Sequence, residues 1–193
     1  MSIYNTILCL GDSLTYGSRD EYRRGYPPEL AKLLNEYTTN QFWVVINEGI
    51  NQERSGDILR RTPKVIATYP DAYAVIILAG TNDTLEGVPE DVYKDTMYQI
   101  IKTCQNYHNI PGGRKIILGS LISLYGVGLL SYSNIGNEWL KKYNLVLKDL
   151  AEVMNIPFVN LTSLEKYRID RCHLNNEGYK EMAKLFFEEL IKI

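Results

Sequence analysis

The chain has 193 residues and a mass of 22.2 kDa, which suits one domain able to bury its own core without disulfides or metals. Hydrophobic residues make up 45% and charged residues 23%, a balance that excludes a disordered or fibrous chain. The net charge of -2 and the pI near 5.8 give no general attraction to nucleic acid or anionic lipid, so neither is an expected partner.

Short apolar runs alternate with longer segments of helical periodicity along the chain. The apolar runs predict strands over residues 3–10, 42–46, 73–78, 115–121 and 156–161. The longer segments predict helices over residues 27–37, 56–68, 89–107, 137–154 and 176–191. This alternation predicts a mostly parallel sheet of about five strands with helices on both faces. We therefore predict an α/β fold, a three-layer α/β/α sandwich, as a single domain over residues 1–193.

No apolar run approaches the roughly 20 residues that span a bilayer, and the first residues, MSIYNTILCLGDS, lack a basic leader followed by a cleavage site. We expect no integral membrane segment and a cytoplasmic location.

The three cysteines, Cys9, Cys104 and Cys172, are odd in number and have no C-x-x-C spacing. This pattern predicts reduced thiols rather than disulfides or a zinc site.

The segments just after the strands are the first places to look for chemistry, because ligands of open α/β sheets bind outside the carboxyl ends of the strands. GDSLTYG follows the first strand, NEGINQERSGD the second, AGTNDT the third and DRCH the fifth. After the fourth strand, residues 121–136 predict a long loop that can be partly helical. Leu129 and Leu130 of this segment either line an acyl pocket or pack at the surface.

Each short motif by itself also has a purely structural interpretation. GDSL can supply a helix cap and GTND a turn. Asp170 and His173 are three residues apart, so one helical turn would bring their side chains to the same face. The other histidine, His108, falls where it can interact with the carbonyl groups that end a helix. His173 is therefore the candidate general base.

Together, GDSL, GTND and DRCH resemble in order the motif blocks of the SGNH hydrolases, the GDSL family of lipases and esterases. The resemblance covers nearly the whole chain and implies a flavodoxin-like fold. It implies Ser13 as nucleophile, His173 as base and Asp170 as the residue that orients the imidazole. The Ser13 backbone N–H and the Asn82 side-chain amide would bind the oxyanion. The α/β-hydrolases are disfavoured because residues 11–15 do not read G-x-S-x-G.

The second block departs from the family pattern. In the family, a glycine five positions after the asparagine that follows the second strand supplies a further oxyanion N–H. Counted without a gap from Asn47, that position is Gln52. A gap would instead align Gly56, and Gly49 is a third possibility. We take Gln52 as the candidate donor, provided that its backbone angles suit a residue other than glycine.

The resemblance thus implies a serine ester hydrolase that forms an acyl-enzyme, with a small-molecule ester as its partner. Candidate substrates are small acyl or acetyl esters, lysophospholipids, thioesters and acylated sugars. No metal and no cofactor are implied. Cys172 is expected to pack rather than attack, because adjacent residues on a turn point in different directions. The alternative function is a catalytically idle flavodoxin-like module that binds a ligand at the same rim. Acyl specificity and oligomeric state are not determined by these patterns.

Overall fold

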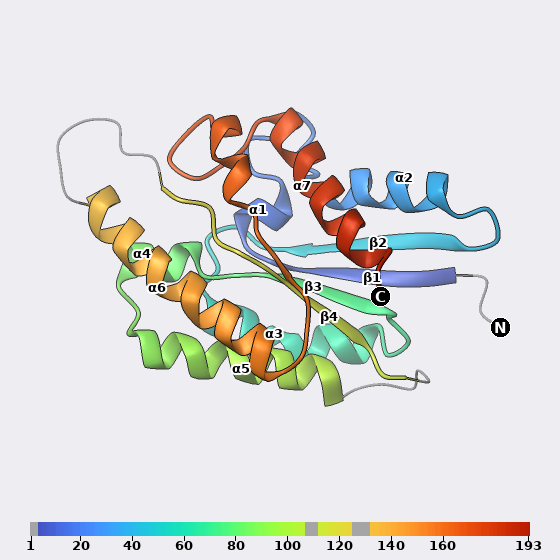
Figure 1. Cartoon of the computed structure of the whole chain (residues 1–193), viewed down its shortest axis with the longest axis horizontal. Helices are drawn as coiled ribbons and strands as arrows, with labels where there is room; N and C mark the ends of the chain where they lie inside the picture. The colour runs from blue at the N-terminus through green and yellow to red at the C-terminus, as the bar shows by residue number, and fades with distance from the viewer. Residues whose placement is uncertain (1–3, 107–111, 125–131) are drawn as a thin grey trace.

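The computed structural model describes residues 4–106, 112–124 and 132–193. At its centre lies a sheet of five parallel strands in the order β2-β1-β3-β4-β5 (Figure 1). The strands are β1 (Tyr4–Gly11), β2 (Phe42–Gly49), β3 (Ala74–Leu78), β4 (Lys115–Gly119) and β5 (Phe158–Val159). The predicted α/β class and the parallel sheet of about five strands are confirmed.

Helices cover both faces of this sheet and complete the three layers (Figure 1). One face carries α2 (Pro27–Tyr37) and α7 (Asn176–Leu190), and the other carries α3 (Ser55–Thr68), α5 (Glu90–Asn106) and α6 (Tyr132–Val153). The connections contain two short helices, α1 (Ser13–Tyr16) and α4 (Thr81–Glu86), and the 3-10 helix η1 (Thr162–Tyr167). Among the described helices, none is both long and apolar enough to cross a lipid bilayer.

The packing of β1 explains why the strands read as continuous apolar runs. Ile7 and Cys9 belong to the core beneath α2 and α7, whereas Leu8 and Leu10 belong to the core beneath α3 and α5. Successive side chains of a strand point to opposite faces, so a strand covered on both faces needs apolar residues at every position. Likewise, all five residues of β3 are buried.

The strand order brings the ends of three strands to one edge. Gly11, the last residue of β1, is in register with Gly49 of β2 and Leu78 of β3. Strand β1 lies at the topological switch point, where open α/β sheets bind their ligands. Glycine is required at position 49, because a Cβ there would lie 2.1 Å from the backbone nitrogen of Tyr16. Helix α1 thus packs directly on the end of β2.

Some predicted boundaries differ from the structure. Strand β5 is shorter than the predicted 156–161, and α6 begins at Tyr132, so the end of the predicted 121–136 loop is helical. The helices α1, α4 and η1 were not predicted, because segments of four to six residues are too short to show a period. His108, Leu129 and Leu130 lie outside the described residues.

Candidate active site

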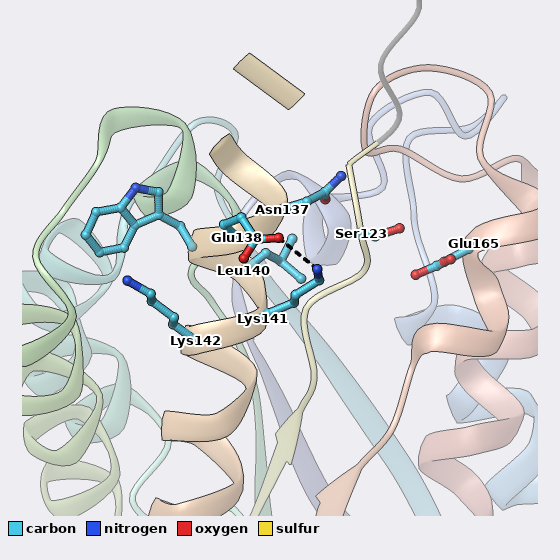
Figure 2. Close-up of a pocket in the computed structure, with 8 residues that line it drawn as sticks. Ser123, Asn137, Glu138, Leu140, Lys141, Lys142 and Glu165 are labelled. Atoms are coloured by element: carbon cyan, nitrogen blue, oxygen red, sulfur yellow. Dashed lines mark hydrogen bonds and ion pairs between the residues drawn. The ribbon is translucent and has the colours of Figure 1, made fainter. Parts of the chain in front are cut away.

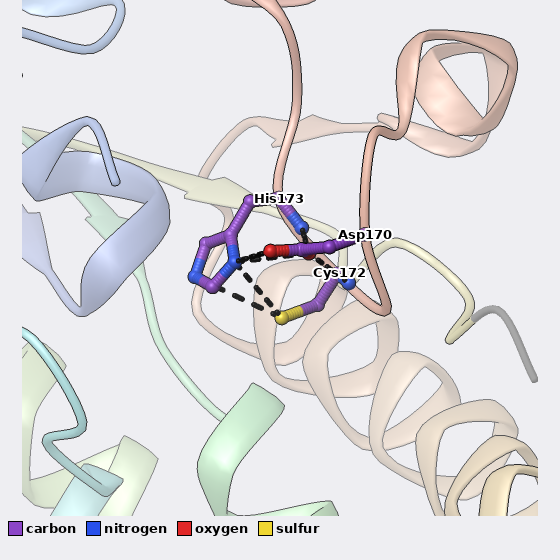
Figure 3. A group of neighbouring side chains, drawn as sticks. All are labelled: Asp170, Cys172 and His173. Atoms are coloured by element: carbon purple, nitrogen blue, oxygen red, sulfur yellow. Dashed lines mark hydrogen bonds and ion pairs between the residues drawn. The ribbon is translucent and has the colours of Figure 1, made fainter. Parts of the chain in front are cut away.

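Three of the predicted site residues meet at the carboxyl edge of the sheet. Ser13 follows β1 as the first residue of α1, and its Oγ lies 3.0 Å from Nε2 of His173. The other ring nitrogen of His173, Nδ1, lies 2.8 Å from Oδ2 of Asp170 (Figure 3). Because His173 is 160 positions from Ser13 in the chain, only the fold brings these groups together.

The residues next to Ser13 form the short helix α1 and so place the Ser13 side chain. Asp12 caps α1, since its Oδ1 accepts the Leu14 backbone N–H at 3.0 Å, and Gly17 ends the helix with a left-handed φ of 91°. The structural interpretation of GDSL is therefore right for Asp12. The same cap leaves Ser13 in the first turn, with its side chain among the residues that line a cleft.

The Asp170–His173 pair does not lie on a helical turn, so that prediction was wrong. The two residues sit in a non-helical loop closed by a β-bridge between Arg168 and Leu174. Within the loop, Oδ1 of Asp170 accepts the backbone N–H groups of Cys172 at 3.0 Å and His173 at 2.8 Å. An Asp side chain that caps its own turn in this way folds the loop back on itself, which brings the carboxylate to the imidazole.

The loop also decides the charge of Asp170. Partial burial raises the pKa of Asp170, but the N–H groups of His173 and Cys172 lower it more, and the net pKa is far below the usual range. The group is therefore a carboxylate at neutral and mildly acidic pH. A carboxylate beside Nδ1 keeps a proton on that nitrogen, which leaves Nε2 of His173 to accept the Ser13 hydroxyl proton. Arg19 adds an ion pair, with its Nε 3.1 Å from Oδ2 of Asp170.

Cys172 lies closer to the imidazole than predicted. Its Sγ is 3.7 Å from Nδ1 and 3.8 Å from Nε2 of His173, so the two adjacent side chains do not diverge (Figure 3). Burial raises the pKa of the Cys172 thiol to about 12, and the nearby carboxylates of Asp170 and Asp12 act in the same direction. A thiol that stays protonated is a poor nucleophile, and Cys172 also packs against the hydrophobic core, both of which favour the predicted packing role.

The same three side chains also have the composition of a metal site. In the described part of the chain, Asp170, Cys172 and His173 form the one compact group of possible ligands, with atoms within 4.8 Å of one another. Both ring nitrogens of His173 already face hydrogen-bond partners, Asp170 at Nδ1 and Ser13 at Nε2. The residues fit a hydrogen-bonded relay better than an ion.

The cleft in front of Ser13 has a volume of about 480 Å³. Among its described lining residues Leu85 is the one aliphatic side chain, and Tyr16 adds an aromatic ring. The lining residues are Ser13, Tyr16, Ser18, Arg19, Arg23, Asn51, Gln52, Asn82, Leu85, Cys172 and His173. All the predicted site residues except Asp170 thus line one space, and Asp170 stands behind His173.

Of the three candidate donors in the second block, Gln52 alone lines the cleft. The Gly49 N–H donates to Oδ1 of Asn47 at 2.9 Å, and Gly56 lies inside α3, where it lines a separate pocket. The assumption about the backbone of Gln52 was wrong, however. Its φ is 66°, in the left-handed region that favours glycine.

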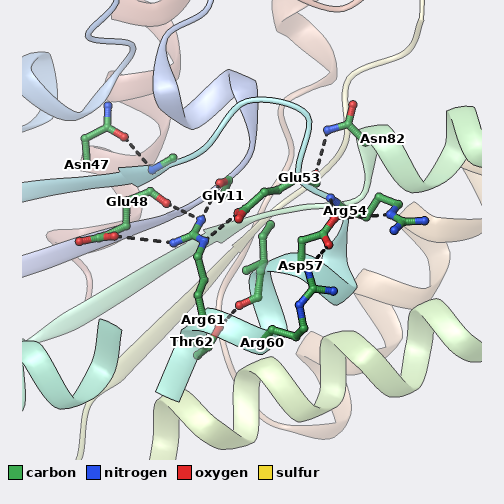
Figure 4. Close-up of polar contacts among 12 residues, drawn as sticks. Gly11, Asn47, Glu48, Glu53, Arg54, Asp57, Arg60, Arg61, Thr62 and Asn82 are labelled. Atoms are coloured by element: carbon green, nitrogen blue, oxygen red, sulfur yellow. Dashed lines mark hydrogen bonds and ion pairs between the residues drawn. The ribbon is translucent and has the colours of Figure 1, made fainter. Parts of the chain in front are cut away.

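Arg61, which sequence reasoning missed, joins the ends of β1 and β2 to the loop that follows β2 (Figure 4). Its mostly buried guanidinium, on α3, binds the carboxylate of Glu53 at 2.7 Å and the backbone carbonyls of Gly11 at 3.1 Å and Glu48 at 2.8 Å. The carbonyl of Glu53 in turn accepts from Nδ2 of Asn82 at 2.8 Å. Residues from β1, β2, α3, α4 and the loop before α3 are thereby linked, and no local pattern in the sequence marks them as partners.

A larger pocket, of about 760 Å³, lies between the start of α6 and η1 (Figure 2). Several of its polar side chains already have partners. Asn137 donates to and accepts from the backbone of Leu124, and Lys141 pairs with Glu138. No histidine lines it within the described residues. The smaller cleft at Ser13 is therefore the candidate active site.

Comparisons with known proteins agree on the fold. The model of the GDSL-like lipase/acylhydrolase family matches residues 9–181. A carbohydrate acetylesterase family member from Sinorhizobium meliloti superposes with a TM-score of 0.79 at 21% identity, covering 96% of this chain and 97% of that one. A catalytic mutant of an acetylxylan esterase from Geobacillus stearothermophilus gives 0.80 at 20% identity, covering 96% and 94%. The aryl esterase of M. smegmatis gives 0.78 at 21% identity, covering 97% and 99%. No curated protein sequence matched.

The left-handed backbone at Gln52 predicts that glycine is the more stable residue there. Gln52→Ala removes the side chain but keeps the cost of a left-handed conformation, because alanine still has a Cβ. Gln52→Gly removes the side chain and that cost as well. We expect Gln52→Gly to exceed Gln52→Ala by about 1 kcal/mol in the free energy of unfolding, measured by urea denaturation. Equal stabilities, or a less stable glycine variant, would show that the conformation carries no strain.

Asp12 predicts a pH-dependent stability. Burial raises its pKa to about 7, so its favourable contribution is full below the unfolded pKa near 4 and is lost as the pH rises through 7. Asp12→Asn keeps an acceptor for the Leu14 N–H and cannot ionise. The stability of this variant relative to the parent should therefore rise by more than about 1 kcal/mol between pH 4.5 and pH 8. The exposed control Asp71→Asn should show no such trend, and a pH-independent difference for Asp12→Asn would contradict the prediction.

Proposed function

The chain belongs to the GDSL-like lipase/acylhydrolase family, and from this premise we propose that Ser13, His173 and Asp170 hydrolyse a small ester through an acyl-enzyme. Membership makes the chain an esterase of the GDSL type. The observation that carries the proposal is the continuous hydrogen-bonded path from Asp170 through His173 to Ser13, at 2.8 Å and 3.0 Å. A path of this kind activates a hydroxyl that is otherwise a weak nucleophile at neutral pH.

The reaction follows from the position of each atom. Nε2 of His173 takes the proton as Oγ of Ser13 attacks the ester carbonyl carbon, and the imidazolium then gives that proton to the departing alcohol. Asp170 stays ionised throughout and stabilises the imidazolium. Water, deprotonated by the same imidazole, cleaves the acyl-enzyme and releases the acid.

The negative charge that forms on the carbonyl oxygen needs fixed N–H donors. One hydrogen of the Asn82 amide is held by the Glu53 carbonyl, and the second is available to the cleft. The backbone N–H groups of Ser13 and Gln52 are the other proposed donors. Donors held by the fold before the reaction stabilise the transition state, each by about 10² to 10³ in turnover.

The cleft suits a short acyl group and a polar alcohol. Most of its described lining residues carry hydroxyl, amide or guanidinium groups, and the apolar side chains beside them are short or aromatic, with Leu85 as the single aliphatic one and Tyr16 as a ring. A long acyl chain would find one aliphatic partner, Leu85, and would strip the neighbouring amide and guanidinium groups of water without replacing their hydrogen bonds. We therefore favour an acetyl or similarly short ester over a lysophospholipid. Both the acetylxylan esterase and the carbohydrate acetylesterase in the comparisons carry names of this kind.

Ser13→Ala should fold normally and lose hydrolysis of p-nitrophenyl acetate by about 10³-fold or more, because the covalent step needs Oγ. Mass spectrometry should find a fluorophosphonate adduct on the parent protein and none on the variant.

Ser18→Ala is the matched control, since Ser18 lines the same cleft and its hydroxyl donates to Asn51. It should keep most of its activity and form the adduct. An unlabelled parent protein without turnover would instead support the idle ligand-binding module, and full activity in Ser13→Ala would assign the nucleophile elsewhere.

Arg61→Lys should lower kcat by about tenfold with little change in KM. Lysine keeps the charge but cannot reach the Glu53 carboxylate and two strand-end carbonyls at once, so the loop that carries Gln52 and holds Asn82 would loosen. Arg60→Lys is the control, because Arg60 is exposed and pairs with Asp57 alone. A lower melting temperature with unchanged kcat for the folded variant would limit Arg61 to a structural role.

A further inference from the structure

Unfavourable backbone conformations concentrate at this cleft. In the described part of the chain, four residues other than glycine have positive φ: Arg19 at 68°, Arg23 at 51°, Gln52 at 66° and Asn155 at 50°. The first three line the cleft at Ser13. Asparagine tolerates this region well, but arginine and glutamine do not. Conformations of this kind persist where the surrounding structure imposes them, and they cluster at functional sites.

Both arginines belong to one short loop, residues 17–25, whose position is fixed. Its two ends touch, since a Cβ on Gly17 would lie 2.0 Å from the nitrogen of Gly25. The loop is tethered by hydrogen bonds from the Tyr179 hydroxyl to its Ser18 carbonyl at 2.7 Å and from the Asn47 amide to its Arg24 carbonyl at 3.1 Å. The two arginine side chains therefore project from a constrained backbone at the cleft.

Positive charge at the cleft is not neutralised by its lining. No carboxylate is among the described lining residues, although the chain as a whole has a net charge of -2. Of the nearby acids, Asp170 pairs with Nε of Arg19, and Asp20 accepts the backbone N–H of Arg24 and lines a neighbouring pocket. No described carboxylate lies within ion-pair distance of the Arg23 guanidinium.

The guanidinium groups keep unused donors. Arg19 meets Asp170 through Nε, its side chain is 65% exposed, and a guanidinium carries five N–H groups. Arg23 is exposed on the same loop. Guanidinium groups pair well with planar or tetrahedral oxyanions, which accept two parallel N–H bonds.

We propose that the ester cleaved at Ser13 carries an anionic oxygen group, such as a carboxylate, that binds Arg23 together with the free donors of Arg19. This inference rests on the proposed esterase function and adds the substrate's charge to it. Arg23 is the specificity-determining residue. Arg19 serves both the substrate and Asp170, so a change at Arg19 would disturb the relay as well.

The test compares two acetyl esters that differ in charge, 4-acetoxybenzoate and its neutral methyl ester. We expect Arg23→Gln to lower the ratio of their kcat/KM values, anionic over neutral, by about fivefold at low ionic strength. Added salt should lower the same ratio for the parent protein. Arg24→Gln is the matched control: Arg24 is the adjacent arginine, stacks over the ring of Tyr22 and lines the neighbouring pocket. It should leave the ratio unchanged.

The outcomes separate the two proposals. A ratio that Arg23→Gln and salt leave unchanged, with both esters hydrolysed by way of Ser13, overturns the anionic-substrate inference and keeps the esterase. If Arg24→Gln lowers the anionic-over-neutral ratio of kcat/KM as much as Arg23→Gln does, the preference comes from the overall positive charge of the surface. That result also overturns the inference. If the parent protein cleaves neither ester and forms no Ser13 adduct, the proposed function fails and this inference fails with it.

Discussion

The parallel pairing of β1 with both β2 and β3 is the constraint on which the site depends. It sets Gly11 opposite Gly49 on one side and Leu78 on the other, so the chain leaves three strands at one edge. Backbone hydrogen bonds between the parallel strands hold this register. Because of this register, Ser13 after β1 and Asn82 after β3 line the same cleft.

Two carboxylates near the nucleophile are driven in opposite directions by their surroundings. Asp12 is fully buried and one of its oxygens, Oδ2, has no hydrogen-bond partner, so desolvation dominates and raises its pKa to about 7. Asp170 is also partly buried, but backbone N–H groups and an imidazole surround it, and its pKa falls well below the usual range. The fold thus keeps the carboxylate of Asp170 ionised behind His173, whereas the buried carboxyl group of Asp12 at the start of α1 ionises less readily.

Rigidity and strain occur together around the cleft. The Arg61 guanidinium holds Glu53 and two strand ends, and the residue before Glu53, Gln52, takes a left-handed conformation that its side chain does not favour. The contacts around a loop can impose such a conformation when together they outweigh its local cost. The same reasoning applies to Arg19 and Arg23, whose loop is closed at its ends and tied to α7.

The sequence by itself determined the fold class, the order of strands and helices, and the motifs that carry Ser13, Asn82, Asp170 and His173, because apolar periodicity and short motifs are local properties of the chain. Tertiary structure decided what local patterns do not encode. Asp170 meets His173 through a capped loop rather than a helical turn, and a bridge between Arg168 and Leu174 closes that loop. The left-handed backbone of residue 52 and the partners of Arg61 and Arg19 likewise depend on contacts with segments distant in the chain. Loop conformation is set by the sum of such contacts, and no single stretch of sequence contains them.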